Sequence, residues 1–259
     1  MSFGGVLRTG IRALDEALGR SGFPRGKVIE IFGPEACGKT TLALQLVAQT
    51  QAAGGTALFV DADHAFDADY ARRLGVVTES LLLSQPDNGE QAIQVAAGLL
   101  RTFALDLIVV DSVAALSPER DDGDAEAAVA LHGEMVSRGL RKLFWLAARS
   151  DASLVLLNHG RARTPIDGNE SGLPSGGQSV ALYSSLRLRL SIMAEDAKGC
   201  RVRVRVVKNR LWECWPEVDL FLRYGSGFSS EPAVSRKPVR PETETGDPVL
   251  RWKAHSTRG

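Results

Sequence analysis

The 259-residue sequence contains few cysteines and has no excess of charge of either sign. Its three cysteines, Cys37, Cys200 and Cys214, are far apart and lack the spacing of a metal site, so neither a disulfide framework nor a zinc site is expected. Reduced cysteines fit the cytoplasm. Basic and acidic residues number 31 each. The net charge of the chain is therefore zero, so nucleic acid could be attracted only by a local cluster of basic residues.

The sequence also lacks long apolar runs. No stretch approaches the roughly 18 apolar residues of a membrane span, and the N-terminus shows no charged segment followed by an apolar one. We therefore expect no signal peptide, no membrane span and no membrane partner. The hydrophobic fraction of 44% is enough for the core of one sizeable α/β domain.

The most informative stretch runs from Val28 to Leu44. A β-branched apolar run leads into the pattern G-x-x-x-x-G-K-T, and a helix-compatible sequence follows. Such a turn points backbone N–H groups at a polyphosphate beside the positive end of a helix, while Lys39 places a charge on the β- and γ-phosphates and Thr40 offers a hydroxyl to Mg²⁺. The alternative to a phosphate-binding loop is a glycine-rich turn that matches the pattern by chance. The predicted nucleotide-binding residues here are Gly33, Pro34, Glu35, Ala36, Cys37, Gly38, Lys39, Thr40 and Thr41.

A second nucleotide element is expected at the end of the apolar run from Leu105 to Ser112. Continuous apolar strands belong to parallel sheets that are covered on both faces. Asp111 closes this run, where a carboxylate can hold Mg²⁺ or its water. The alternative is an ordinary aspartate at a strand end.

The remaining pattern predicts an α/β fold, with a mainly parallel sheet, helices on both faces and later strands in antiparallel or mixed pairing. The long segment 160–180, which contains Arg161 and Arg163, is expected to be a mobile functional loop. Helices are expected over 11–18, 41–53, 68–75, 90–102 and 127–149, and strands over 28–32, 56–61, 81–83, 105–112, 153–159, 180–190, 201–210 and 218–228.

Several motifs together resemble the ATPase core of the bacterial RecA recombinase family from Gly33 to about Phe228. In combination they are far more specific than any one of them. They are Gly33-Pro34-Glu35 with Gly38-Lys39-Thr40-Thr41, Val60-Asp61-Ala62-Asp63-His64-Ala65, Tyr70-Ala71-Arg72-Arg73-Leu74-Gly75, Ser84-Gln85-Pro86-Asp87 with Gly89-Glu90-Gln91-Ala92, Val109-Val110-Asp111-Ser112-Val113-Ala114-Ala115-Leu116, Gly176-Gly177 and Val206-Val207-Lys208-Asn209.

The resemblance implies a P-loop NTPase of RecA type with ATP and Mg²⁺ as ligands. It implies that Tyr70 stacks on the adenine and that Asp67 lies near its exocyclic amine. It also implies a homo-oligomer in which Lys208 and Arg210 reach the adjacent subunit's phosphates. A cation supplied across an interface makes hydrolysis depend on assembly.

The resemblance further implies that two loops, 118–130 and 159–176, hold single-stranded DNA. The first is acidic and the second lacks large apolar side chains, so weak and salt-sensitive DNA binding is expected. The residues assigned to DNA binding are Arg141, Arg161, Arg163, Gly176 and Gly177.

Two positions depart from the family pattern. The catalytic pair implied here is Lys39 with Asp63, which stands where the family has a glutamate that orients the attacking water. A carboxylate displaced by about an ångström can slow a reaction on the order of 100-fold, so slow turnover is expected. His159 replaces a glutamine that senses the γ-phosphate; a ligand role and a simple polar strand end both stay open.

We expect a lead-in segment over 1–27, the ATPase core over 28–228 and a disordered tail over 229–259, without the family's N-terminal polymerisation segment and C-terminal domain. The expected function is a weakly hydrolysing ATP-binding protein of DNA repair and the SOS response that engages single-stranded DNA or a RecA filament. One alternative is a regulatory adaptor of RecA or a translesion polymerase, similar to the ImuA-type accessory proteins. A stand-alone recombinase is the other.

Overall fold

The structure is a computed structural model that describes residues 5–102, 105–119, 125–160 and 177–229. The expected tail over 229–259 lies outside the described residues except for Ser229. Most of the expected loop over 160–180 lies outside them as well, as do Arg161, Arg163 and Gly176.

A nine-stranded sheet forms the centre of the described part of the chain, in the order β11-β10-β9-β8-β3-β7-β6-β4-β5. The six strands from β8 to β5 are mutually parallel, and those from β8 to β11 pair in antiparallel fashion. A small two-stranded sheet joins β1 (Val6–Leu7) to β2 (Phe23–Pro24). The large sheet contains β3 (Val28–Gly33), β4 (Ala57–Asp61), β5 (Leu82–Ser84), β6 (Leu107–Asp111), β7 (Ser153–His159), β8 (Leu186–Asp196), β9 (Gly199–Asn209), β10 (Glu217–Arg223) and β11 (Gly227–Ser229).

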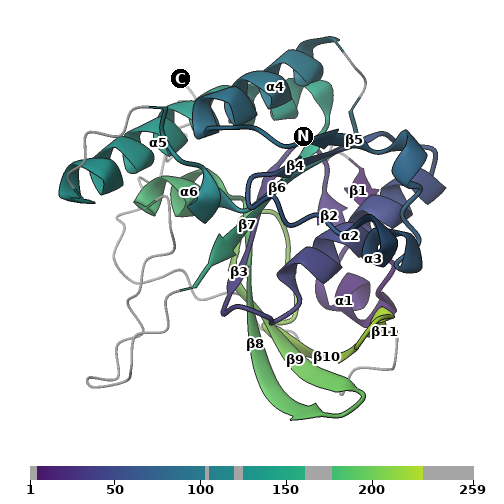
Figure 1. Ribbon diagram of the computed structural model, residues 1–259. Coiled ribbons are helices and arrows are strands. Elements are labelled where there is room, and N and C mark those ends of the chain that lie inside the picture. The colour runs from purple at the N-terminus through teal and green to yellow at the C-terminus, as the bar shows by residue number, and fades with distance from the viewer. Residues whose placement is uncertain (1–4, 103–104, 120–124, 161–176, 230–259) are drawn as a thin grey trace, which may run out of the picture.

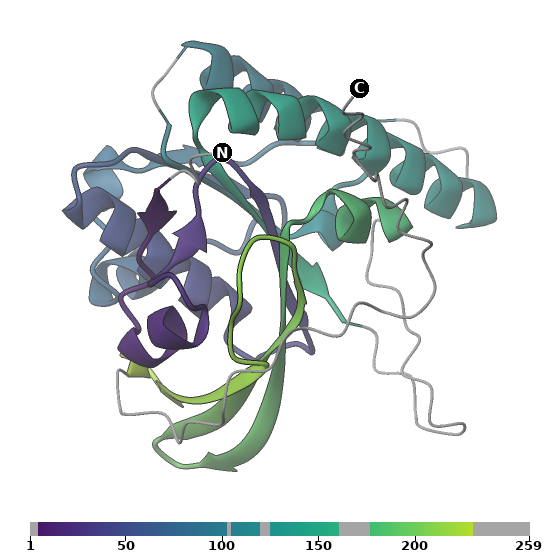
Figure 2. The same ribbon diagram turned by 180° about the vertical axis from the view of Figure 1, so that it is seen from behind.

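Helices cover both faces of the sheet (Figures 1 and 2). One face carries α1 (Arg12–Ala17), α2 (Lys39–Ala52) and α3 (Ala68–Arg73), and the other carries α4 (Gly89–Thr102), α5 (Ala125–Ser150) and α6 (Gly177–Tyr183). Two short 3-10 turns, Thr78–Ser80 and Val113–Ala115, follow α3 and β6. In the described ranges, no helix combines the length and apolar character needed to cross a membrane.

Successive residues of the central strands pack into two different cores, because side chains alternate across a sheet. In β3, Ile29 and Ile31 belong to the core beneath α1 and α2, whereas Val28 belongs to the core beneath α4 and α5. Ile11 and Phe23, from the expected lead-in segment, are fully buried in the first core. Residues 5–27 therefore pack on the same sheet that leads into the glycine-bounded turn.

The predicted α/β class with helices on both faces of a mainly parallel sheet is confirmed. Two local predictions were wrong. The segment that was expected to begin a strand at Val180 is helix α6, in which Val180 is buried and Tyr183 packs on Phe144 of α5. The single strand expected over 218–228 is a hairpin, because the backbone turns at Gly225, whose φ is +74°.

A buried charge network joins three neighbouring strands at the centre of the sheet. The Glu30 carboxylate of β3 is fully buried. It accepts a hydrogen bond from the Asn158 side-chain amide of β7 at 3.0 Å and from the Arg187 guanidinium of β8 at 2.5 Å. The guanidinium also lies 4.9 Å from the centre of the Phe32 ring. One carboxylate therefore compensates the Arg187 charge and also accepts from the Asn158 amide in the interior of the sheet.

Replacing Glu30 by alanine should destabilise the protein strongly. Glu30→Ala leaves the Arg187 charge and the Asn158 amide without their acceptor, which typically costs about 3–5 kcal/mol of unfolding free energy. Urea unfolding measures this loss. The matched control is Arg12→Ala, which breaks an exposed ion pair with Glu16 and should change the unfolding free energy far less. Equal losses in the two variants would contradict this account of the network.

Candidate functional site

The glycine-bounded turn connects the end of β3 to the first residue of α2. Gly38 has a φ of +90°, the left-handed region that favours glycine. A Cβ atom there would lie 2.8 Å from the Phe228 ring and 2.9 Å from the Leu222 side chain. Both the backbone and the packing of the β10–β11 hairpin therefore require glycine at this position.

Lys39 places its charge inside the turn. Its side chain is buried, and the ammonium group donates to the backbone oxygens of Gly33 at 3.2 Å and Pro34 at 2.6 Å. These oxygens belong to the same turn that the motif assigns to phosphate binding. The cation is thus held at the N-terminus of α2, where the helix dipole also favours an anion.

Thr40 and Asp111 meet across the site. The Thr40 hydroxyl donates to Asp111 Oδ2 at 2.7 Å, which joins the start of α2 to the end of β6. Burial raises the pKa of the Asp111 carboxyl to about 6, the Thr40 hydrogen bond lowers it, and the nearby Asp63 and Asp61 charges raise it further. The carboxylate is therefore poorly compensated at neutral pH and would gain from a cation beside it.

This donor set fits Mg²⁺ bound together with a polyphosphate. Mg²⁺ is usually held by one or two protein oxygens, with phosphate and water oxygens completing its shell. Thr40 and Asp111 supply two such oxygens side by side. In the described ranges, no group of three His, Cys, Asp or Glu side chains could enclose a metal by itself. The predicted metal residues therefore suit a nucleotide-bound cation better than a metal cage.

The acidic pair after β4 divides into two roles. Asp61 is buried and accepts hydrogen bonds from the N–H groups of Ala65 and Phe66 and from the Gln85 side chain, all at 2.9–3.0 Å. It therefore shapes the loop that follows β4. Asp63 is exposed, lines the site, and accepts a hydrogen bond of 3.4 Å from Ser112. Of the two, Asp63 has its carboxylate available to a water molecule.

The predicted adenine residues lie on α3. The Tyr70 hydroxyl is 2.8 Å from the Thr41 hydroxyl, which connects α3 to α2, and Tyr70 lines the pocket. Asp67 instead caps α3 by accepting a hydrogen bond from the Tyr70 N–H at 2.9 Å, and it does not line the pocket. Contact of either residue with a base stays a prediction.

A cleft of about 340 Å³ gathers most of the predicted residues. Three lining residues from the end of β10 were missed by the sequence analysis. The Gln45 side chain positions this hairpin against α2, because it bonds both the N–H and the carbonyl of Phe228 at 2.8 and 3.0 Å. The predicted residues in the lining are Glu35, Ala36, Gly38, Lys39, Thr40, Thr41, Asp63, Tyr70, Asp111 and His159, and the missed ones are Leu222, Arg223 and Tyr224.

Other predicted nucleotide residues lie outside this lining. Gly33, Pro34 and Cys37 belong to the turn itself, and Cys37 is fully buried, which raises the pKa of its thiol. Lys208 donates to the backbone oxygens of Ala181 and Leu182 and so caps α6. Arg210 is exposed. The role implied for Lys208 and Arg210, at an adjacent subunit, stays a prediction.

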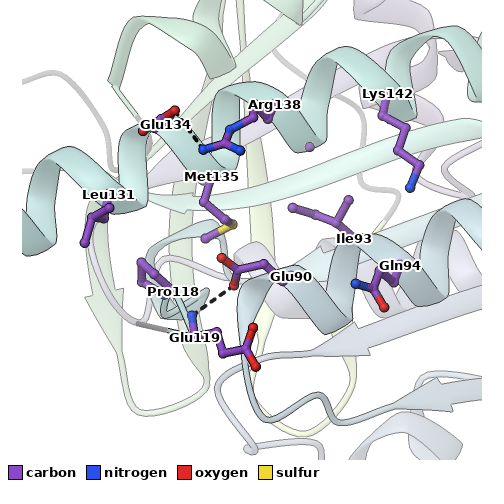
Figure 3. Close-up of a pocket in the computed structure, with 11 residues that line it drawn as sticks. Glu90, Ile93, Gln94, Pro118, Glu119, Leu131, Glu134, Met135, Arg138 and Lys142 are labelled. Atoms are coloured by element: carbon purple, nitrogen blue, oxygen red, sulfur yellow. Dashed lines mark hydrogen bonds and ion pairs between the residues drawn. The ribbon is translucent and has the colours of Figure 1, made fainter. Parts of the chain in front are cut away.

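The described DNA-binding candidates are on the α5–α6 side of the sheet. Arg141 is exposed on α5, and Gly177 is the first residue of α6. A second hollow of about 530 Å³ lies between α4 and α5 (Figure 3). Glu90, Ile93, Met135, Arg138 and Lys142 are among its lining residues, and they include no residue of the glycine-bounded turn. It is therefore separate from the nucleotide cleft.

The strand, the glycine-bounded turn, the Lys39-Thr40 pair and the facing Asp111 define a P-loop α/β protein. Residues 5–229 match the family described as RecA N-terminal domain. The chain therefore belongs to the RecA family, as the sequence motifs predicted.

Curated relatives agree with this family. The chain is 45% identical over 235 residues to Protein RecA of Rhodococcus jostii, and 44% identical over 235 residues to Protein RecA of Mycobacterium sp. strain KMS; each comparison covers 87% of this chain and 67% of the relative. It is 44% identical over 232 residues to Protein RecA of Citrifermentans bemidjiense, covering 87% of this chain and 69% of the relative.

Removing the Asp111 charge should stabilise the protein at neutral pH when no nucleotide or metal is present. Its pKa is about 6 in the folded chain against an ordinary value of 3.8, so the carboxyl favours folding below pH 3.8 and loses that contribution as pH rises through 6. Asp111→Asn should therefore raise the unfolding free energy by on the order of 2–3 kcal/mol at about pH 7.5, and by little at about pH 4.

Urea unfolding in EDTA at both pH values measures this difference. The control variant is Asp87→Asn, which alters an exposed carboxylate and should change stability by less than about 0.5 kcal/mol at either pH. An Asp111→Asn variant that is less stable than the wild type at about pH 7.5 would show that the carboxylate is not strained by burial.

Proposed function

We propose that this chain binds ATP with Mg²⁺, hydrolyses it slowly, and acts in DNA repair by engaging single-stranded DNA. The observation that carries the proposal is the convergence of Lys39, Thr40, Asp63 and Asp111 on one cleft at the N-terminus of α2. Membership of the RecA family supports it, because this is a family of ATPases that act in DNA recombination and repair.

The chemistry needs positioning and charge compensation rather than a covalent intermediate. Lys39 would exchange its bonds to the Gly33 and Pro34 oxygens for phosphate oxygens. Thr40 and Asp111 would hold the metal, which supplies positive charge to the phosphates when bound. Asp63, at the rim of the same cleft, would orient the attacking water.

Slow turnover follows from the residues that surround this water. Asp63 is shorter than glutamate, and the hydrogen bond that it receives from Ser112 is long, so its carboxylate is loosely positioned. His159 lines the same cleft from the end of β7, where its imidazole can bond a phosphate oxygen. Tyr70 and Tyr224 also line the cleft and offer aromatic rings for the base.

A second candidate function is a regulatory adaptor of RecA or of a translesion polymerase in the SOS response. The observation that favours it concerns Lys208, whose ammonium group donates to backbone oxygens of α6 in its own chain, whereas an oligomeric ATPase needs this cation at the adjacent subunit's phosphates. An enzyme that acts in a homo-oligomer should show DNA-stimulated ATPase activity and form filaments by light scattering. An adaptor in the cytoplasm should do neither and should co-purify with RecA. A stand-alone recombinase would in addition catalyse strand exchange without RecA.

Lys39→Ala should abolish binding of ATP, because no other lysine lines the cleft within the described residues. Isothermal titration with a non-hydrolysable ATP analogue and Mg²⁺ measures the affinity. A loss of about 100-fold or more is expected, since the amine neutralises phosphate charge in a buried setting. The control is Lys198→Ala, an exposed lysine outside the cleft, with unchanged affinity. Unchanged binding by Lys39→Ala would remove the assignment of the turn.

Asp63→Glu should raise the rate of ATP hydrolysis. The added methylene moves the carboxylate toward the phosphates, and a shift of about an ångström is worth on the order of 10- to 100-fold. The measurement is kcat for phosphate release, with and without single-stranded DNA. The control is Asp69→Glu on the exposed side of α3, where no change is expected. A lower kcat for Asp63→Glu would show that Asp63 is not the group that orients water.

A further inference from the structure

The exposed face of α5 presents a large aromatic side chain between basic ones. Trp145 is 65% exposed, an unusually high value for a residue type that is normally well buried. Arg141 precedes it by four residues and Arg149 follows it by four, and both are exposed. Residues four apart lie on the same face of a helix, so Arg141, Trp145 and Arg149 emerge from the same face of α5.

The charge on this face is mostly positive and mostly uncompensated. The exposed residues between Gly133 and Ser150 include four cations, Arg138, Arg141, Lys142 and Arg149, and one acid, Glu134. Glu134 pairs with Arg138 at 2.7 Å (Figure 3). In the described part of the chain, no ion pair involves Arg141, Lys142 or Arg149. Three cations therefore remain available on a chain whose net charge is zero.

Aromatic packing supports the base of the exposed ring. Trp145 contacts the edge of the Phe144 ring with centroids 5.9 Å apart and an interplanar angle of 82°. Phe144 in turn packs on Tyr183 of α6 with centroids 5.7 Å apart. Phe144 thus joins α5 to α6, while the neighbouring Trp145 side chain is largely exposed. Lys142, one turn earlier, borders the hollow between α4 and α5 (Figure 3).

We propose that Trp145 is a stacking platform for one base of single-stranded DNA, and that Arg141 and Arg149 bind phosphates on either side of it. This inference rests on the proposed engagement of single-stranded DNA and names its contact surface. Proteins that bind single strands of any sequence combine these two features, an aromatic ring that stacks on the base and cations that contact the backbone.

The spacing of the cations suits this ligand. With a rise of 1.5 Å per residue, the Arg141 and Arg149 backbones are about 12 Å apart along α5. A stacked strand places one phosphate about every 3.4 Å, so this length spans about three nucleotides. In a DNA duplex the faces of the bases are stacked on one another, so a duplex could contact the cations but could not stack on the indole ring. The exposed ring therefore favours a single strand.

Fluorescence anisotropy with a labelled oligo-dT of roughly ten nucleotides tests the platform. Trp145→Ala should weaken binding roughly 5- to 150-fold, because one base loses its stacking partner, and should leave the salt dependence unchanged. Arg149→Ala should make the slope of log K against log salt shallower by about 0.7, because one phosphate contact is lost. The matched controls are Met193→Ala, a half-exposed apolar residue of β8, and Arg101→Ala, an exposed cation in the last turn of α4; both should bind like the wild type.

The Trp145 fluorescence gives a direct signature. Oligo-dT should quench tryptophan emission in the wild type, and Trp145→Phe should abolish that change while retaining part of the affinity, because a smaller ring can still stack. A purely structural role for Trp145 would leave the quenching in place. Thermal unfolding of each variant checks that it is folded.

The possible results test DNA binding by the chain and the Trp145 platform separately. If the wild type fails to bind oligo-dT at low salt, the proposed engagement of single-stranded DNA fails and the platform fails with it. If the wild type binds and Trp145→Ala binds equally well, the platform is overturned while DNA binding elsewhere on the chain stands. If Trp145→Ala binds DNA normally but no longer co-purifies with RecA, the face is a protein-docking surface and the platform is likewise overturned.

Discussion

The hydrogen bond from Thr40 to Asp111 joins the two elements on which the site depends. One partner lies in the first turn of the helix that follows the glycine-bounded turn, and the other ends the central strand β6. The sheet order puts β3 and β6 on either side of β7, so parallel strands with buried faces fix the spacing between turn and carboxylate. The partial desolvation that raises the pKa of Asp111 is also what prepares this carboxylate to receive a cation.

The proposed nucleotide site and the proposed DNA site lie on different sides of the sheet. The nucleotide cleft is built where α2 and α3 meet the ends of β4 and β6, and the β10–β11 hairpin closes it through Gln45. The proposed DNA platform lies on the helices of the opposite face. Glu30, Asn158 and Arg187 link three neighbouring strands of the sheet, and Asn158 also accepts a hydrogen bond from the N–H of His159 in the cleft.

The sequence could predict whatever depends on local chemistry. The glycine-bounded turn and the Asp111 strand end are each defined by a few consecutive residues, and both appear where expected. Helix α6 was misread because Val180, Leu182 and the leucines of β8 alternate like a strand, whereas packing against α5 decides the structure. Tyr224 gave no signal, because only the hairpin's long-range pairing brings it to the cleft. The sequence also does not reveal that Trp145 is exposed while its neighbour Phe144 is half-buried, because this depends on how α5 is oriented on the sheet.

The central claim is that a triphosphate rests on the backbone amides between Phe32 and Leu42, with a metal between Thr40 and Asp111. A crystal structure of the chain with a non-hydrolysable ATP analogue and Mg²⁺ tests it most directly. The account predicts phosphate oxygens within hydrogen-bonding distance of these amides, Lys39 on the β- and γ-phosphates, and Mg²⁺ beside the Thr40 hydroxyl. A nucleotide bound elsewhere, or a turn that stays closed around Lys39 at saturating nucleotide, would contradict it.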